Sequence, residues 1–336
     1  MTFEDTLVAP VERGKYGPRG MPGDIIQLEN GDLLIGYTSG GIGARKSADL
    51  GKTWSQEFTL LPDPSDPQRQ GSYRHPSFLR MPDGDILMSY IYNAASLPYQ
   101  AHNYYRRSAD EGQTWSQQYC MTPHPSYCLM HNAKFLMTSD GRIIAPVEFK
   151  KRWPKSHDHS GYVSMVFYSD DDGYSWWPSE NHVDVFPHEC QEPDVVQLAD
   201  ARLMMLFRTY SGFMGRAYSA DDGETWEDVE LLRDMPLPPN ASAITCDRLP
   251  GERNRDLLLI RCTTGDGHGR RNPLVAMLSR DNGRSWENPR IIAGDRSDDY
   301  GYQSVTFVDD LAVISYHARD GLHVARISTD WFYEEE

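Results

Sequence analysis

Short apolar segments alternate with polar turns along the whole chain, and their spacing predicts strands. In one unit an alternating segment over residues 77–81 ends at the turn Asp83-Gly84, and a second apolar segment follows over residues 86–88. Apolar residues that alternate with polar ones between Gly- or Asp-containing turns are typical of half-buried strands. The same arrangement recurs at Asn30-Gly31, Asp140-Gly141, Asp200, Pro250-Gly251 and Asp309-Asp310. These six units predict an all-β chain with almost no helix.

A second repeat, Ser-x-Asp-x-Gly-x-(Thr or Ser)-Trp, occurs five times, at residues 47–54, 108–115, 169–176, 219–226 and 279–286. Its starts are separated by 61, 61, 50 and 60 residues. The Asp side chain can accept backbone N–H groups across a tight turn, and the Gly supplies a φ that other residues avoid. The Trp is a large apolar plate that can close the turn onto the sheet. The motif therefore predicts a hairpin turn, preceded by strands such as residues 163–168 and 274–278.

About four short strands in each unit of roughly 50 residues, repeated six times, are the pattern of a six-bladed β-propeller. The sixth unit lacks the Ser-to-Trp turn, so we expect the N-terminal strand to complete it. Because the repeat runs along nearly the whole chain, residues 1–336 are predicted to form one domain rather than the two that length alone allows.

Composition narrows the classes of function. With 39% apolar and 24% charged residues, the chain can bury a substantial core and is not a candidate for disorder. Its net charge of −16 argues against nucleic acid as a partner, because phosphate binding needs clustered Lys and Arg. No segment approaches the roughly 20 apolar residues of a membrane helix, so no membrane partner is expected. Five cysteines without a close-spaced pair indicate reduced thiols. The start of the chain has neither a basic leader nor an apolar segment, and we expect a cytoplasmic protein.

The repeat also predicts where a ligand binds. Strands nearest the axis of a propeller direct the residues at their starts toward the central channel. Counting eight residues back from the polar turn of each unit selects Pro22, His75, Asn132, Glu192, Ser242 and Tyr302. Polar residues at the starts of apolar strands around one axis indicate the opening of a ligand-binding site. The alternative is that these strand ends are polar only because they are exposed to solvent.

The five Ser-to-Trp turns, embedded in this strand pattern, resemble those of the Asp-box (BNR-repeat) propellers of the sialidase superfamily. The likeness covers nearly the whole chain, but the turn is specific for the fold and not for a function. In these families it lies on the rim of the propeller, and non-enzymatic proteins carry it too. The motif carboxylates are therefore interpreted as structural: Asp49, Asp110, Asp171, Asp221 and Asp281. Function has to be argued from the site.

The resemblance implies a catalytic glutamate and a set of substrate-binding arginines. In sialidases a Glu opens the innermost strand of a middle blade and an Arg closes the next strand, and Glu192 and Arg208 match this pair. A further family Arg precedes a strand that runs into an Asp box, and Arg271 fits it, with Arg270 one residue away. Several guanidinium groups can bind a carboxylate bidentately, which indicates an acidic sugar.

The resemblance leaves two family residues with a choice of positions. The first family Arg corresponds to Arg19 by blade order, or to Arg74 by its local sequence. The nucleophilic Tyr heads the last blade, where Tyr302 fits and Tyr300 is the fallback. A Tyr with an ordinary pKa of about 10 is a poor nucleophile, but an adjacent Glu192 can take its proton.

The chain departs from the family pattern at the acid/base. Sialidases carry an Asp on the loop that leads into the first Asp-box strand, and residues 37–46 contain no carboxylate. Glu148 follows Asn132 by 16 residues, the same offset that separates Arg208 from Glu192. We therefore expect Glu148 to end an inner strand near the axis, either as the proton donor or as a salt-bridged structural residue.

Three polar residues near the predicted axis have no counterpart in the sialidase set. They are His75, His131 and Asn132, which we list as candidates for substrate contact. His131 is equally compatible with a packed, hydrogen-bonded strand residue. The segment His157-Asp158-His159 could fold over the mouth, but two His on one short loop are more often solvated than metal-bound, and no metal is predicted.

Three functions remain open. The leading one is a sialidase-like glycoside hydrolase acting on an acidic sugar, with exo-α-sialidase as the default and Tyr302, Glu192 and Glu148 as catalytic residues. The second is a polysaccharide lyase acting on uronic-acid glycans, in which His75, His131 or a Tyr removes the α-proton of an arginine-bound carboxylate. The third is a non-catalytic glycan- or protein-binding propeller.

Because the chain has a net charge of −16, an acidic ligand would have to bind in a local basic pocket. No cofactor is implied, and the oligomeric state stays open.

Overall fold

The chain folds into antiparallel sheets. The computed structural model describes residues 3–11, 20–64, 71–94, 101–124, 127–151, 161–238, 243–263 and 271–334. Within these ranges all regular structure is β-strand, apart from two 3₁₀ helices, η1 (Gly251–Arg253) and η2 (Thr329–Tyr333). The prediction of an all-β chain is confirmed. Neither of these helices has the length or the apolar character required to span a bilayer.

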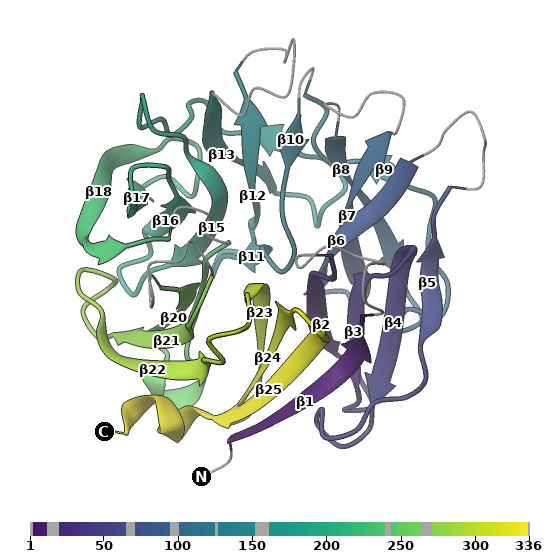
Figure 1. The fold of residues 1–336 in the computed structure, drawn as a ribbon. Helices are drawn as coiled ribbons and strands as arrows, with labels where there is room; N and C mark the ends of the chain where they lie inside the picture. The colour runs from purple at the N-terminus through teal and green to yellow at the C-terminus, as the bar shows by residue number, and fades with distance from the viewer. Residues whose placement is uncertain are drawn as a thin grey trace.

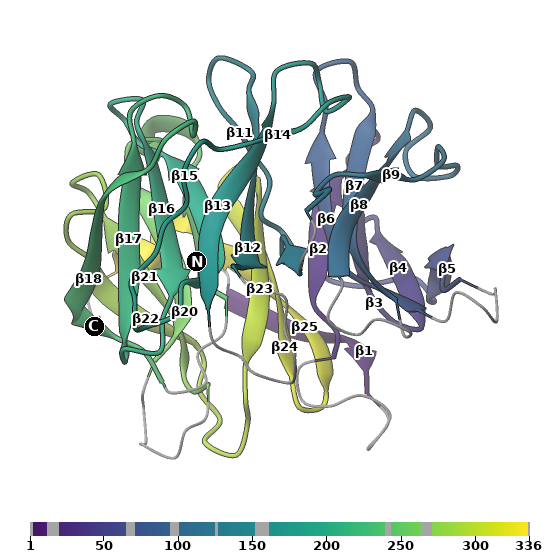
Figure 2. The same ribbon diagram turned by 90° about the horizontal axis from the view of Figure 1, so that it is seen from above.

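Three sheets are four-stranded meanders whose strands pair in chain order. The first contains β2 (Gly23–Gln27), β3 (Leu33–Thr38), β4 (Gly41–Ser47) and β5 (Phe58–Pro62). The second contains β15 (Gln191–Gln197), β16 (Leu203–Arg208), β17 (Phe213–Ser219) and β18 (Glu227–Pro236). The third contains β19 (Thr245–Arg248), β20 (Leu257–Cys262), β21 (Leu274–Ser279) and β22 (Glu287–Ala293). In both views the strands from β15 to β18 follow one another from the middle of the molecule outward (Figures 1 and 2).

A fourth four-stranded sheet joins the two ends of the chain. It contains β23 (Gly301–Val308), β24 (Leu311–Ala318), β25 (Gly321–Ser328) and the N-terminal β1 (Phe3–Pro10). β1 pairs antiparallel with β25, with Phe3 opposite Ile327, so the N-terminal strand completes the last unit as predicted. Figure 1 shows this purple strand lying along the yellow ones.

The remaining sheet has nine strands and differs from the six separate units that the sequence predicts. It contains β6 (Gly71–Arg80), β7 (Ile86–Ala94), β8 (Ala101–Ser108), β9 (Tyr119–Cys120), β10 (Cys128–Leu129), β11 (Leu136–Met137), β12 (Ile143–Lys150), β13 (Tyr162–Ser169) and β14 (Trp177–Pro178). The two halves of this sheet are joined where β10 pairs in parallel with β8, with Cys128 opposite His102. This short parallel contact merges two of the six units into one sheet.

Each Ser-to-Trp turn is closed by the side chains that the motif supplies. The Ser47 hydroxyl donates to Asp49 Oδ1 (2.8 Å) and accepts the Gly51 N–H (2.8 Å). Asp49 also accepts the backbone N–H (2.9 Å) and the hydroxyl (2.6 Å) of Thr53. The Thr53 bonds hold the pKa of Asp49 at about 2, against a small opposing effect of burial. The same bonds form around the other motif carboxylates, Asp110, Asp171, Asp221 and Asp281.

The turns also connect neighbouring sheets, and the apolar cores lie between those sheets. The Gly112 turn approaches Leu34 of the first sheet, so that a Cβ added at Gly112 would lie 3.4 Å from its side chain. The Gly51 turn approaches Val313 of the last sheet in the same way, at 3.6 Å. Arginines reinforce these contacts, as where Arg326 Nε donates to the Leu50 carbonyl (2.6 Å). All five cysteines are unpaired, and four of them are buried in these cores.

Candidate functional site

The six residues selected by counting eight back from each polar turn are called the register positions below, and three of them have an irregular backbone. His75, Glu192 and Tyr302 have positive φ angles of 54°, 47° and 52°, a region that non-glycine residues rarely adopt. Each lies where the first strand of its group breaks register with the next strand, between Arg74 and Ser77 in β6 and at the same place in β15 and β23. Such bulges turn a side chain out of the regular alternation of a strand and are enriched next to functional sites.

Three aromatic rings from separate segments meet at these bulges. The His75 and Tyr302 rings lie edge to face with centroids 5.1 Å apart, and His75 and His131 lie similarly at 4.9 Å. His131, which follows β10, is stacked on Tyr302 with an interplanar angle of 17° and a centroid separation of 5.9 Å. The structure thus brings together two register positions and a histidine that has no counterpart in the sialidase set.

Glu192 lies between the phenol and a guanidinium group. The Tyr302 hydroxyl donates to Glu192 Oε1 (3.4 Å), and Arg208 Nη1 lies 3.3 Å from the same oxygen. Arg271 lies over the Tyr302 ring, with its guanidinium carbon 5.3 Å from the ring centroid. Glu192 is 5% exposed, Arg208 8% and Arg271 1%. Two buried arginines near one carboxylate make this group locally basic in a chain that is acidic as a whole.

The charges of this group hold Glu192 ionised and Tyr302 neutral. Burial opposes ionisation of Glu192, but the positive charges of Arg208, His131 and Arg271 outweigh it, and the pKa of Glu192 is lowered. Burial raises the pKa of Tyr302, the Glu192 charge raises it further, and the two arginines oppose both effects without cancelling them. A neutral phenol beside a carboxylate is an arrangement in which the carboxylate can accept the phenolic proton.

Glu148 lies beside this group, as the sequence offset predicts. The backbone N–H of Glu192 donates to Glu148 Oε2 (2.8 Å), and Glu148 Oε1 lies 3.5 Å from His131 Nε2. The Glu148 side chain is buried, with 4% of the residue exposed. It therefore holds the Glu192 bulge with one oxygen and faces the imidazole with the other.

Asn132 holds the backbone around the site. Its side-chain amide donates to the carbonyls of Gly23 and Tyr302, both at 2.9 Å. Because both amide hydrogens are used in this way, Asn132 fixes the position of Tyr302. The predicted substrate contact of Asn132 stays a prediction, since these two bonds use only the amide nitrogen.

The residues that the sequence left as alternatives have different surroundings in the structure. Tyr300 accepts the Asp295 N–H (3.0 Å) and packs against Tyr316 in the core, so the fallback Tyr does not contact Glu192. Arg74 is half-buried and lies close enough to His75 to lower the pKa of that imidazole, after the larger effects of burial and of His131. Several predicted residues lie outside the described residues, namely Arg19, His157, Asp158, His159, Ser242 and Arg270.

Two carboxylates near the site were not selected by the sequence. Glu189, 8% exposed, accepts a hydrogen bond from Gln191 Nε2 (2.7 Å). Burial raises the pKa of Glu189 to about 7, with Lys150 opposing and Glu148 adding to the shift. Glu57 accepts the hydroxyls of Tyr37 (2.6 Å) and Ser39 (3.0 Å), and so brings a carboxylate to the loop that lacks one in sequence. The place of Glu189 three residues before Glu192 was the only signal that could have identified it.

A second layer of polar side chains lies two residues beyond the register positions. Lys134 follows Asn132 by two residues, Asp194 follows Glu192 by two, and Lys134 Nζ lies 3.0 Å from Asp194 Oδ2. Asp194 also accepts the Cys246 N–H (2.8 Å) from the next sheet. Asp24, two residues after Pro22, accepts the Phe78 N–H (2.7 Å) in the same manner. These bonds tie the first strands of neighbouring sheets together beneath the site.

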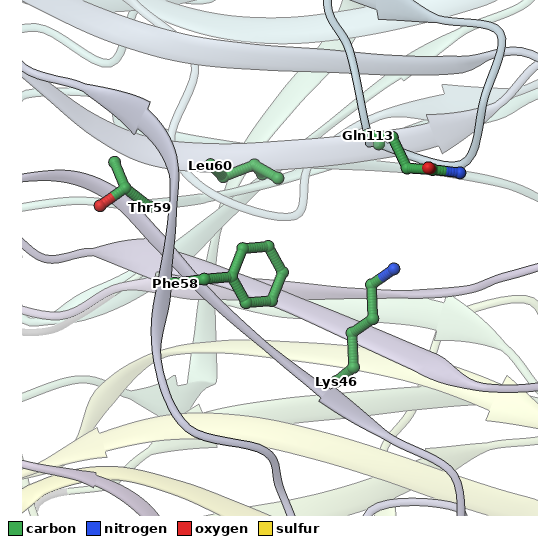
Figure 3. Close-up of a pocket in the computed structure, with 6 residues that line it drawn as sticks. Lys46, Phe58, Thr59, Leu60 and Gln113 are labelled. Carbon is green, nitrogen blue, oxygen red and sulfur yellow. The ribbon is translucent and has the colours of Figure 1, made fainter.

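A separate pocket lies away from these residues. It has a volume of about 410 Å³ and is lined by Lys46, Phe58, Thr59, Leu60, Gly112 and Gln113 (Figure 3). It includes none of the predicted site residues and lacks the convergent charges of the Glu192 group. Across the described ranges no cluster of three or more His, Cys, Asp or Glu side chains could hold a metal ion.

Comparisons with known proteins identify relatives at low identity. A family model described as a BNR repeat-like domain matches residues 41–314. The chain is 24% identical to a sialidase of Micromonospora viridifaciens over 90% of its length and 23% identical to a sialidase of Clostridium perfringens over 68%. It spans 50% and 60% of the length of these two relatives. Its fold is similar to that of the intramolecular trans-sialidase of Ruminococcus gnavus, with a TM-score of 0.73 at 15% identity, covering 94% of this chain and 95% of that one.

Proposed function

Because the chain belongs to the BNR repeat-like domain family and has a sialidase-type fold, we propose that it is a glycoside hydrolase acting on an acidic sugar, with an exo-α-sialidase reaction as the default. The observation that carries the proposal is the contact between the Tyr302 hydroxyl and Glu192 Oε1 (3.4 Å), flanked by Arg208 and Arg271. A binding protein needs the arginines but has no need of a buried phenol paired with a carboxylate.

We further propose that the sheets form one six-bladed propeller domain. The turn of one unit packs against the sheet of the preceding one, and this holds for Gly51 against Val313 as well as for Gly112 against Leu34. A chain in which the first unit contacts the last in the same way as the second contacts the first has a cyclic arrangement of units. In this arrangement the bulges at His75, Glu192 and Tyr302 face one central channel.

In the proposed reaction the Tyr302 phenol is the nucleophile and Glu192 is its base. Glu192 accepts the phenolic proton while the phenolic oxygen attacks the anomeric carbon, which gives a covalent glycosyl intermediate. The lowered pKa of Glu192 keeps it deprotonated for this step, and the raised pKa of Tyr302 means that the phenol requires a base. The anomeric configuration is retained because two displacements occur in sequence.

Arg208 and Arg271 are proposed to bind the substrate carboxylate, with Arg74 or Arg19 as a third guanidinium. Arg208 Nε is buried without a hydrogen-bond partner in the described part of the chain, so it has a donor available for an anion. A planar guanidinium group matches a carboxylate in a bidentate geometry, which a Lys ammonium does not.

A lyase is the second candidate, and the two histidines favour it. His75 and His131 both lie within 6 Å of the Tyr302 ring, centroid to centroid. Burial, followed by the charges of His131 and Arg74, lowers the pKa of His75, and a neutral imidazole can remove the α-proton of an arginine-bound uronate. Such an elimination gives an unsaturated product that absorbs in the ultraviolet.

Turnover of a fluorogenic α-sialoside, run beside a panel of uronides with absorbance recorded, tests the proposal. We expect release from the sialoside by the wild-type protein, and loss of release in Tyr302→Phe and Glu192→Gln. Tyr300→Phe is the matched control, since its hydroxyl bonds to backbone away from Glu192. Full activity in Tyr302→Phe would refute the nucleophile, and an absorbance rise on a uronide without sialoside release would establish the lyase.

A further inference from the structure

We propose that His131, oriented by Glu148, transfers the proton to and from the leaving oxygen, in place of the carboxylate that residues 37–46 lack. This inference rests on the proposed glycosidase function and names the proton donor for it. The sequence pointed to Glu148 for that role and left His131 open between a substrate contact, a lyase base and a packed strand residue.

The surroundings of the two nitrogens of His131 differ. Nε2 lies 3.5 Å from Glu148 Oε1, so a carboxylate orients the ring from that side. Nδ1 is buried and has no hydrogen-bond partner within the described ranges. The residue is 8% exposed, and a buried nitrogen without a partner is costly unless a ligand group completes its hydrogen bonding. A leaving oxygen bound at the site can accept the bond that the protein leaves unmade.

The imidazole lies beside the proposed nucleophile. Its centroid is 5.9 Å from that of Tyr302, and the two rings are within 17° of parallel. His75, edge-on to both rings, does not compete for the proton, because burial and the charges of His131 and Arg74 lower its pKa well below the usual value.

The proton balance closes over both steps. In the first step the phenolic oxygen of Tyr302 bonds to the anomeric carbon and its proton moves to Glu192. The bond to the leaving oxygen breaks, and that oxygen takes a proton from His131, which becomes neutral. In the second step water bonds to the anomeric carbon and gives a proton to His131, while the departing phenolate recovers its proton from Glu192. Each residue ends in its initial state.

The nearby carboxylates are less suited to this role. Glu148 accepts the Glu192 N–H (2.8 Å) with one oxygen and faces His131 with the other, so both of its oxygens are engaged by protein groups. Both oxygens of Glu57 accept hydroxyl groups within the first sheet. The raised pKa of Glu189 suits an acid, but this carboxylate accepts a hydrogen bond from Gln191 Nε2 (2.7 Å) and takes no part in the ring contacts that join His75, His131 and Tyr302. Glu148 is therefore a positioning residue, and Glu189 is the competing donor.

The test is the dependence of kcat/KM on the leaving group, measured with α-sialosides that range from nitrophenyl to sugar leaving groups. A general acid matters most for poor leaving groups. The kcat/KM of His131→Asn is therefore expected to fall on the order of 10²–10⁴-fold with a sugar leaving group and less than about tenfold with nitrophenol. His131→Gln serves as a second variant in case the first does not fold. In Glu148→Gln the loss of kcat/KM should depend on the leaving group in the same way but should be smaller, because the variant keeps a hydrogen-bond acceptor for the ring and loses the charge.

His102→Asn is the matched control, since its ring bonds to the Thr122 carbonyl (2.9 Å) elsewhere in the same sheet. It should leave the whole series unchanged. An equal loss across all leaving groups in the His131 variants would show that the residue is only structural and would overturn the inference. The leaving-group trend appearing in Glu189→Gln instead would assign the proton to Glu189. A wild-type protein that releases no leaving group from any acidic-sugar glycoside would refute the proposed function itself, and the proton assignment with it.

Discussion

Replacing Lys134 by Met is expected to destabilise the fold by about 3–5 kcal/mol at pH 8, because it leaves a buried carboxylate without its counter-charge. Lys134 Nζ lies 3.0 Å from Asp194 Oδ2, and the two side chains are 0% and 6% exposed. The ammonium group also donates to the Ile244 carbonyl and to Thr245 Oγ1. The substitution keeps much of the side-chain volume, so the loss reports on charge and hydrogen bonding rather than on a cavity.

The pH dependence of this loss follows from Asp194. Burial raises the pKa of Asp194 above its usual value even though Lys134 and the Cys246 N–H oppose the shift. A group whose pKa is raised on folding contributes most stability below its unfolded pKa and loses that contribution as the pH rises through the folded value. Without Lys134 the folded pKa rises further, so the destabilisation should shrink by roughly 1.4 kcal/mol for each unit that the pH is lowered over the range in which Asp194 is protonated in the folded variant but ionised in the folded wild type.

Urea unfolding followed by tryptophan fluorescence at pH 5.5 and pH 8 measures this effect. Lys134→Met/Asp194→Asn should be more stable at pH 8 than Lys134→Met alone, because the unpaired charge is gone and the amide oxygen can still accept the Cys246 N–H. Lys52→Met, at an exposed turn position, is the control and should change the unfolding free energy little. A loss below about 1 kcal/mol at pH 8, or a loss independent of pH, would refute the reasoning.

Three further outcomes are expected. Arg208→Lys keeps the charge but loses the planar fork, so kcat/KM for an acidic-sugar glycoside should fall about 10–100-fold; an unchanged value would exclude Arg208 from carboxylate binding. His323 lies 2.8 Å from Asp5 on β1, and although burial opposes protonation, its two Asp partners raise its pKa. His323→Gln should therefore reduce stability by about 1 kcal/mol below pH 6.5 and progressively less as the pH rises through the folded pKa. Thermal melts of the variant and the wild type at pH 6 and pH 9 measure this, and a larger loss of stability at pH 9 than at pH 6 would contradict it. Asp49→Asn weakens the bonds to Thr53, and a melting temperature equal to that of the wild type would show that the turn does not depend on the carboxylate.

The sequence predicted the strands and turns well because each carries its own physical signal. The Ser-to-Trp motif contains all the donors and acceptors of its turn, as the bonds around Asp49 show, so no distant residue is needed to identify it. The N-terminal strand was predicted to pair with the last unit from the absence of a turn there, and β1 does pair with β25. The parallel contact of Cys128 with His102 was not predictable, since two-residue strands leave no periodicity to detect.

The sequence selected candidate site residues partly by one repeat position and partly by resemblance or spacing, as for Arg271 and Glu148. His75, Glu192 and Tyr302 were selected by one register, and they share a positive φ that no sequence pattern indicated. His131 lies one residue before its register position, and in that unit Ala133 rather than Asn132 has the positive φ (53°). Glu189 and Lys134 were missed because burial within an assembled set of sheets, rather than local sequence, determines their role.

The two polar layers have different roles, as Glu192 and Asp194 on β15 show. A register residue such as Glu192 is displaced by its bulge and faces the charged group around Tyr302. Two residues later Asp194 bonds to the backbone of the neighbouring sheet, which fixes the strand that carries the bulge. Strain at the bulge can persist only if the surrounding structure holds it, and the second layer together with Glu148 provides that support. Substitutions in the second layer should therefore reduce stability before they alter chemistry, and substitutions at the register positions should do the reverse.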